Sequence, residues 1–175
     1  MPRSEHRRTT GERFSLEARR FVDWADGSVS NDTLTAPIAL RRVVALYAAA
    51  LELPQPWIEG VSTQPEPEPV FFGARLAAVR SRAAAIPLQH YSEIFSPLVS
   101  APEEPVVGDL ADDLLDIYRD VAVGLQLYEA GRIDDAIWQW GFNFQLRWGK
   151  HASSAIRALH CYLAQEDPSG LSSTA

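Results

Sequence analysis

Residues 106–160 read VVGDLADDLLDIYRDVAVGLQLYEAGRIDDAIWQWGFNFQLRWGKHASSAIRALH, and this stretch decides the fold. Apolar residues recur at steps of three and four over residues 109–130 and again over residues 133–165, which is the period of an amphipathic helix. Gly131 separates the two runs, and glycine is the usual residue where a helix ends in the left-handed conformation. The pattern therefore predicts a C-terminal αα-hairpin of two long helices.

Three stretches upstream show the same helical period: residues 16–25, 36–53 and 71–86. Thr35 can cap the second of them, and Pro37 falls in a first turn, where proline is tolerated. Such faces must be buried against one another, and strand patterns are nearly absent. We therefore predict an all-α fold, a single-domain bundle of four to five helices.

The remaining segments are predicted to be irregular. Residues 54–69 read PQPWIEGVSTQPEPEP, which is too proline-rich for a helix or a central strand, and Trp57 and Ile58 are expected to pin this loop to the core. Residues 90–99 are apolar and compact, which favours a short helix or turn. The predicted organisation is a disordered basic tail over 1–13, a helical bundle over 14–165 and a disordered tail over 166–175.

Composition narrows the classes of function. The chain has 175 residues with 46% hydrophobic content, enough to bury one core, and its net charge of −7 argues against nucleic acid as a partner. The one cysteine cannot form an internal disulfide, the N-terminus lacks the apolar core of a secretory signal, and the longest apolar run, residues 43–51, is too short to span a bilayer. We expect a cytoplasmic protein with no membrane contact.

Charge is unevenly distributed along the chain. Arginines crowd the first 20 residues, whereas residues 103–135 are strongly acidic. One interpretation is a disordered basic tail beside a solvated acidic face. The other is an arm that docks on that face or on an acidic partner.

Aspartates form a stripe in the first helix of the predicted hairpin. Their spacing of three and four residues places them on one side of the helix, where like charges repel each other by a few tenths of a kcal/mol per pair. The stripe is either a solvated face with a capping residue, a surface for an arginine-rich partner, or a source of carboxylates for a divalent metal. Its members are Asp109, Asp112, Asp113, Asp116 and Asp120.

An apolar stripe with one histidine runs along the second helix of the hairpin. His151 falls on this stripe, and burying it unpaired would cost about 1–3 kcal/mol, so we expect Asp113 or Asp116 to accept a hydrogen bond from it. The pair is either a satisfied core contact or a general base at a cleft. Trp140 and Trp148 are either core anchors or the lining of a groove for a peptide or planar ligand.

Other motifs of chemistry are absent from the sequence. There is no glycine-rich phosphate loop, no nucleophile elbow and no paired zinc signature. His160 falls roughly opposite His151 on an ideal helix, so the two are not expected to share a metal ion. We therefore predict no cofactor and assign no metal ligands.

The stretch quoted above resembles the bacterial family DUF5063, a domain of unknown function, and the similarity extends over residues 14–163. The resemblance implies a small cytoplasmic bacterial helical protein and no particular activity. The chain departs from the family pattern at Gln139, Gly141, Gln145 and Arg147, where relatives carry charged or histidine residues, so metal-dependent activity of relatives is not expected here. Matching positions are Asp113, Tyr118, Asp120, Trp138, Trp140, Trp148, Gly149 and His151.

Two hypotheses of function follow. The favoured one is a non-enzymatic interaction or adaptor module that presents an acidic and aromatic surface to a protein partner, as a monomer or homodimer. The alternative is an enzyme with a metal ion or a His/Asp general base between the last two helices. The candidate site comprises Asp113, Asp116, Asp120, Tyr118, Trp140, Trp148 and His151.

Overall fold

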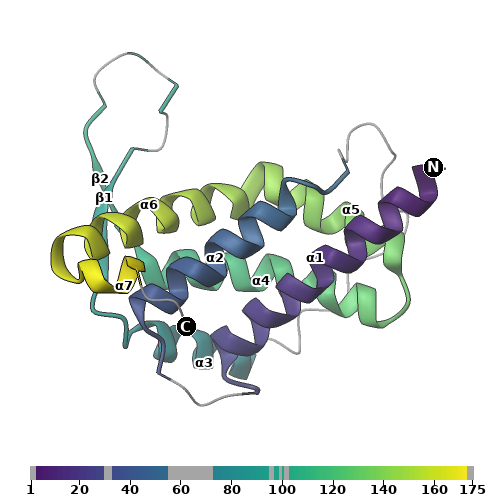
Figure 1. Cartoon of the computed structure of the whole chain (residues 1–175), viewed down its shortest axis with the longest axis horizontal. Coiled ribbons are helices and arrows are strands. Elements are labelled where there is room, and N and C mark those ends of the chain that lie inside the picture. Colours follow the sequence, from purple (N-terminus) through teal and green to yellow (C-terminus); the bar gives the residue numbers. More distant parts are fainter. Residues whose placement is uncertain are drawn as a thin grey trace.

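The central helix of the structure is α4 (Leu110–Glu129), which packs against α1, α3, α5 and α6. The computed structural model describes residues 3–29, 33–54, 73–94, 97, 98, 100 and 103–172, with residues 3–7 described by their backbone alone. The predicted all-α bundle is confirmed, with a two-stranded hairpin added to it (Figure 1). The other elements are α1 (Arg3–Asp26), α2 (Ala36–Ala50), α3 (Gly73–Ala83), β1 (His90–Glu93), β2 (Val106–Asp109), α5 (Ile133–Asn143), the π-helix η2 (Phe144–Trp148), α6 (Gly149–Glu166) and α7 (Pro168–Ser172).

The predicted αα-hairpin is present between α4 and α5. Gly131 has a φ of 78°, a left-handed conformation that favours glycine. The backbone N–H of Gly131 donates to the carbonyl of Tyr128 at 3.0 Å, and that of Arg132 donates to the carbonyl of Leu127 at 2.9 Å. These bonds satisfy carbonyls at the end of α4 and reverse the chain direction.

The second arm of the hairpin is not one regular helix. It consists of α5, the π-helix η2 and α6 in succession, whereas the sequence pattern predicted one helix over residues 133–165. A Cβ at Gly149 would overlap the carbonyl oxygen of Phe144, so glycine permits the wide turn. Each residue of a π-helix rotates by a smaller angle about the helix axis than a residue of an α-helix does. The π-helix therefore changes which faces of α5 and α6 point to the core.

The basic tail predicted over residues 1–13 is wrong for residues 3–13, because α1 begins at Arg3. Thr10, Gly11 and Phe14 are buried, and a Cβ at Gly11 would overlap the side chain of Ile137 on α5. Packing on α5 outweighs the weak apolar period of this segment. The arginines are therefore carried on a docked helix, and Arg19 forms an ion pair of 2.7 Å with Glu129.

The C-terminal tail also differs from the prediction. Residues 168–172 form α7, which packs against α6 and α2, while residues 173–175 lie outside the described part. Gly170 is buried, and a Cβ there would overlap the ring of Pro37. A short turn of helix, where disorder was expected, thus covers the N-terminal end of α2.

The stretch over residues 90–99 does not form the predicted helix or turn at its start. Residues His90–Glu93 form β1, which pairs antiparallel with β2 so that Tyr91 is opposite Gly108. The hairpin projects from the end of the bundle that carries α7, and the N-terminus of α1 lies at the opposite end (Figure 1). Each strand has only four residues, which is too short to show a clear alternating pattern, so the pairing of β1 with β2 could not be predicted from the sequence.

The core is apolar and aromatic. Buried side chains of α1, α2, α4, α5 and α6 form one cluster, which contains Phe14, Tyr118, Trp140 and Trp148. Within the described residues, no helix has the length and apolar character needed to cross a membrane. The predicted contacts of Trp57 and Ile58 lie outside the described residues.

Candidate functional site

The candidate site begins at the N-terminus of α4. Asp109 caps this helix, because its side chain accepts hydrogen bonds from the backbone N–H groups of Ala111 at 2.8 Å and Asp112 at 3.1 Å. The cap fixes the first turn, so Asp113 and Asp116 follow one turn apart on the side that faces α6. Asp109 is therefore the capping residue that one interpretation of the aspartate stripe included.

His151 on α6 lies between these two carboxylates. Its Nδ1 is 2.8 Å from Oδ1 of Asp113, and its Nε2 is 3.5 Å from Oδ2 of Asp116. The predicted contact between His151 and an aspartate of the preceding helix is confirmed. Asp113 is buried, whereas the His151 side chain is 38% exposed, so solvent reaches the ring but not the carboxylate behind it.

A tyrosine that the sequence pattern did not single out completes this network. The hydroxyl of Tyr91, on β1, donates a hydrogen bond to Oδ2 of Asp113, and the side chain of Ser154 is hydrogen-bonded to the same tyrosine. The carboxylate therefore binds His151 with one oxygen and Tyr91 with the other. This network, defined as Tyr91, Asp113 and His151, joins β1, α4 and α6.

Burial and hydrogen bonding shift the pKa values in the network. The pKa of His151 is raised, first by its hydrogen bond with Asp113 and then by the charges of Asp113, Asp116 and Asp120, against the opposing effect of burial. Burial raises the pKa of Asp113, while its bonds with His151 and Tyr91 lower it. Burial and the hydrogen bond to Asp113 raise the pKa of Tyr91, so its phenol remains protonated at neutral pH.

Asp120 lies two turns beyond Asp113 and is nearly inaccessible. Its Oδ2 is 3.5 Å from Nε of Arg147 on η2 and accepts no hydrogen bond from the described residues. Burial raises the pKa of Asp120 to about 6, an effect that the Arg147 charge opposes. Arg147 thus faces a carboxylate of α4.

The aspartate stripe is largely neutralised within the molecule. Asp112 pairs with Arg80 of α3, and Asp116 pairs with Arg119 at 2.8 Å as well as facing His151. The like charges therefore have basic partners along the whole of α4. Of the alternatives left open for the stripe, a solvated face with a capping residue fits best, since Asp109 caps α4 and the Asp112 side chain is 54% exposed.

Three of the predicted site residues lie elsewhere. Tyr118 is buried on another side of α4 and donates a hydrogen bond of 2.9 Å to Asp26 of α1. Trp140 is buried, and its indole N–H donates to the carbonyl of Val121 at 3.0 Å. Trp148 is also buried, with its ring 4.8 Å from that of Phe144. These three side chains build the core, so they do not line a groove at the surface.

The geometry does not favour a metal centre. In the described part of the chain, no group of three His, Cys, Asp or Glu side chains is arranged to hold a metal ion. Asp113 and Asp116 direct their oxygens at His151, which competes for the same lone pairs. The network is better suited to hold protons than a cation.

A surface groove of about 280 Å³ lies beside the network, between the start of β1 and the second half of α6. Tyr91 contributes to both, because its hydroxyl reaches Asp113 while the residue also lines the groove. The lining residues are Leu88, Tyr91, Ser92, Arg157, Ala158, Cys161, Tyr162, Gln165 and Glu166. No sequence pattern indicated this groove, since β1 itself was not expected.

Comparison with known families agrees with this fold. The family model described as Domain of unknown function (DUF5063) matches residues 11–165. The chain belongs to the DUF5063 family. The resemblance predicted from the sequence is thereby confirmed, and the matched range contains the whole Tyr91, Asp113 and His151 network.

A solved structure shares the fold with this DUF5063 protein. The crystal structure of protein BF1032 from Bacteroides fragilis superposes with a TM-score of 0.61 and 21% sequence identity, covering 85% of this chain and 91% of that one. At this identity the likeness establishes the fold alone. None of the curated proteins matches the chain.

Proposed function

We propose that this DUF5063 protein is a non-enzymatic interaction module of the bacterial cytoplasm, which binds a protein partner through its β1–β2 arm. The arm is defined here as the described residues between His90 and Asp109. One observation carries the proposal: the arm projects from the bundle and exposes apolar side chains, with Leu98 97% and Val107 75% accessible (Figure 1). Ile94 and Val106 of the arm are exposed as well, so apolar side chains are gathered on one projecting element, as is common in surfaces that bind a partner.

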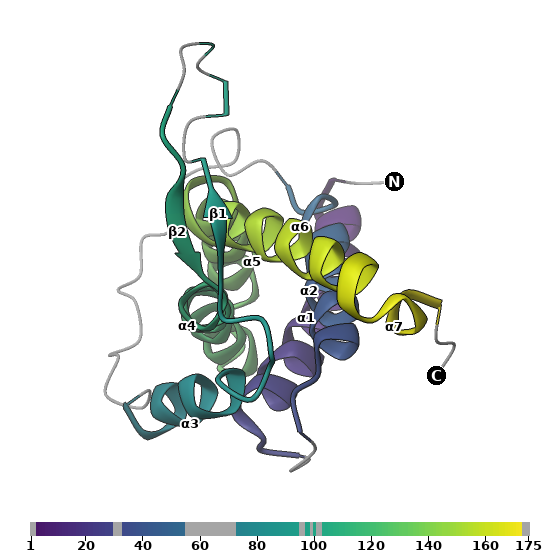
Figure 2. The same ribbon diagram turned by 90° about the vertical axis from the view of Figure 1, so that its left-hand side faces the viewer.

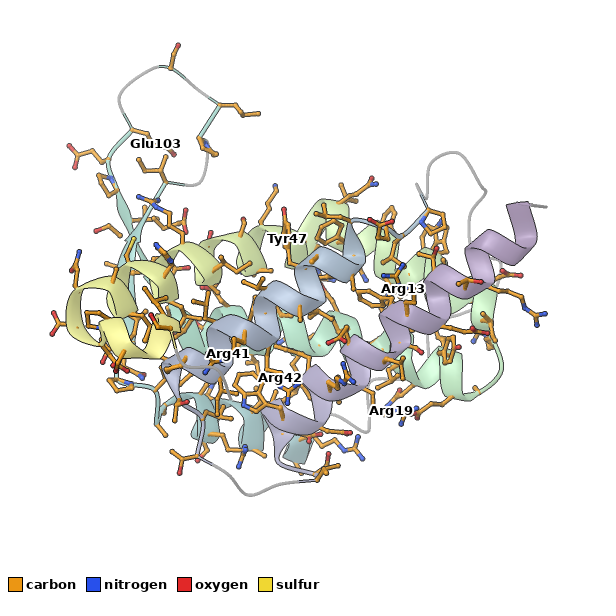
Figure 3. The ribbon with its side chains drawn as sticks, in the orientation of Figure 1. Arg13, Arg19, Arg41, Arg42, Tyr47 and Glu103 are labelled. Carbon is orange, nitrogen blue, oxygen red and sulfur yellow. The ribbon has the colours of Figure 1, made fainter. Side chains whose placement is uncertain are left out.

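The arm differs from the surface expected from the sequence. Its apolar residues stand beside acidic ones, and Glu103 lies on the arm away from the arginines of α1 and α2 (Figure 3). Trp140 and Trp148 are buried, so they cannot contact a partner. The adaptor hypothesis is therefore kept, with the arm replacing the aspartate stripe and the tryptophans as the binding surface.

The enzyme hypothesis is less well supported by the geometry. A general base must have a free lone pair, but both ring nitrogens of His151 face carboxylates, and its pKa is raised. A carboxylate accepts hydrogen bonds, so a ring nitrogen that faces one is placed to donate its N–H and not to accept a proton from a substrate. A structural role explains the network better: Tyr91 connects β1 to α4 and α6, and so holds the arm in place on the bundle.

Photocrosslinking in cells tests the proposed function. A photoreactive amino acid is placed at position 107 on the arm, and a matched one at position 51, where Leu51 is 63% exposed at the end of α2. We expect discrete crosslinked products at position 107 that are absent at position 51 and are lost when Leu98→Glu is added. The same products at both positions, or none at position 107, would reject the arm as the binding surface.

A further inference from the structure

We infer that the free edge of β1 accepts an extended segment of the partner protein as an added strand, with an acidic side chain of that segment paired to Arg157. This inference rests on the proposed function and names the kind of partner. Three independent features carry it: backbone groups of β1 that point away from β2, the groove beside them, and a cation on the groove wall.

The backbone pattern identifies which groups of β1 are free to bind. The N–H of Leu110 donates to the carbonyl of Gln89 at 2.9 Å, so these two residues form a hydrogen-bonded pair of the antiparallel ladder. Such pairs alternate along a ladder, which makes Tyr91 and Glu93 the next residues bonded to β2. The backbone groups of His90 and Ser92 therefore point to the opposite edge, where an added strand would meet them.

The groove lies at this free edge. Figure 2 shows β1 between β2 and α6, and the groove is lined by Ser92 on one side and by α6 residues from Arg157 to Glu166 on the other. Its lining also includes Leu88, Ala158 and Tyr162. An extended segment crossing here can place one apolar side chain in the groove while its backbone bonds to Ser92.

The charge on the groove wall selects the segment. Arg19, Arg80 and Arg147 each have a carboxylate within 4.0 Å, whereas Arg157 forms no ion pair with the described residues. A carboxylate on the added strand would form an ion pair with Arg157, as aspartates and glutamates of this chain do with Arg19, Arg80 and Arg147. The favoured occupant is thus an extended polypeptide that carries an apolar residue and a neighbouring Asp or Glu.

Peptide selection with the full chain tests this inference. Random ten-residue peptides are displayed on phage, and the enriched sequences are synthesised with a fluorophore and titrated by anisotropy. We expect enriched peptides to combine an apolar and an acidic residue. Ser92→Pro removes one N–H from the free edge but none from the β2 ladder, so it should weaken binding at least tenfold, while Ser92→Ala should stay within twofold.

A charge exchange provides a second measurement that does not depend on the strand. Arg157→Glu should weaken binding of the acidic peptide at least fivefold, and exchange of the peptide's acidic residue for lysine should restore binding to that variant. Circular dichroism and the melting temperature of each variant establish that the bundle is folded.

The outcomes separate this inference from the proposed function. No enriched peptide, or equal affinities for Ser92→Pro, Arg157→Glu and the unaltered chain, would overturn strand addition. If crosslinking at position 107 nevertheless gave specific products, the arm would remain the binding surface and only the added strand would be rejected. If peptides bound as expected but position 107 gave no products, strand addition at β1 would stand and the exposed surface around Val107 would be rejected as the contact with the partner.

Discussion

The two halves of α4 are joined to the C-terminal helices in different ways. At its C-terminal half, Trp140 packs directly on Gly124 and donates to the carbonyl of Val121. At its N-terminal half, the buried Asp113 is hydrogen-bonded to His151 and Tyr91, which are both partly exposed. The apolar contact is expected to supply stability, because it removes large surfaces from water, whereas the polar contact fixes where the arm lies and depends on pH.

The largest effect should come from removing the apolar contact. Trp140→Ala deletes a fully buried side chain and is expected to lower the free energy of unfolding by about 3–5 kcal/mol. Urea unfolding followed by circular dichroism measures this change. Trp138→Ala is the matched control, since Trp138 is half-buried and stacks on Phe142 at 4.7 Å, and it should cost about 1 kcal/mol. Equal losses in the two variants would contradict the contrast.

A smaller loss is expected when the same contact is overfilled. A methyl group at Gly124 would overlap the indole of Trp140, so Gly124→Ala should destabilise by about 1–3 kcal/mol although alanine favours helix. Gly73→Ala is the control on α3, where nothing lies within 4 Å, and it should be neutral or stabilise by up to about 1 kcal/mol. Thermal unfolding compares them, and a stabilising Gly124→Ala would show that the helices are not in close contact there.

The contrast also explains how much of the molecule the sequence could predict. Helical periods, the turn at Gly131 and the proximity of His151 to Asp113 all arise from local spacing or from one hairpin, and they were predicted correctly. The burial of Trp140 and Trp148 was one of two alternatives, because an aromatic stripe has the same spacing in a core as in a groove. Only packing against Gly124 and Phe14 decides between them.

Features that depend on distant contacts were missed. Tyr91 joins the network because β1 pairs with β2 across a connection that has no periodic pattern, so neither the strand nor its tyrosine had a local signal. The π-helix depends on the close approach of Gly149 to Phe144, which the apolar spacing around it does not reveal. The helical start of α1 was missed because it is buried by a distant element, with Gly11 against Ile137 of α5, which its own apolar spacing does not reveal.

At the polar half of α4, loss of one hydrogen bond should loosen the arm more than the bundle. Tyr91→Phe removes the hydroxyl that bonds to Asp113 and is expected to cost about 0.5–1.5 kcal/mol in overall stability. Hydrogen exchange should accelerate at the amides of Tyr91 and Glu93, which bond to β2, while the middle of α4 is little changed. Tyr162→Phe is the control, since Tyr162 also lines the groove but is not among the hydrogen-bond partners of Asp113 in the described residues. Uniform acceleration across the molecule would mean that the network supports the core rather than the arm.

The smallest effect is a dependence of stability on pH that only the polar half should show. Because the folded-state pKa of His151 is raised above 6.5, its stabilising contribution is complete below that pH and is lost as pH rises through the folded value. The pKa of Asp120 is raised from 3.8 to about 6, so the folded state binds this proton more tightly than the unfolded chain does. The free energy of unfolding should therefore also fall as pH rises from about 4 to about 6.

Two variants separate these pH ranges, because each removes one titrating group. In urea unfolding at successive pH values, His151→Gln should abolish the loss above pH 6.5, and Asp120→Asn should reduce the loss in the acidic range. Asp120→Asn will leave a residual slope there, since burial also raises the pKa of Asp113. The opposite result would be a gain in stability of the unaltered chain relative to His151→Gln as pH rises from 6.5 to 8. His151 would then be neutral in the folded state, and its carboxylate partners would not determine its pKa.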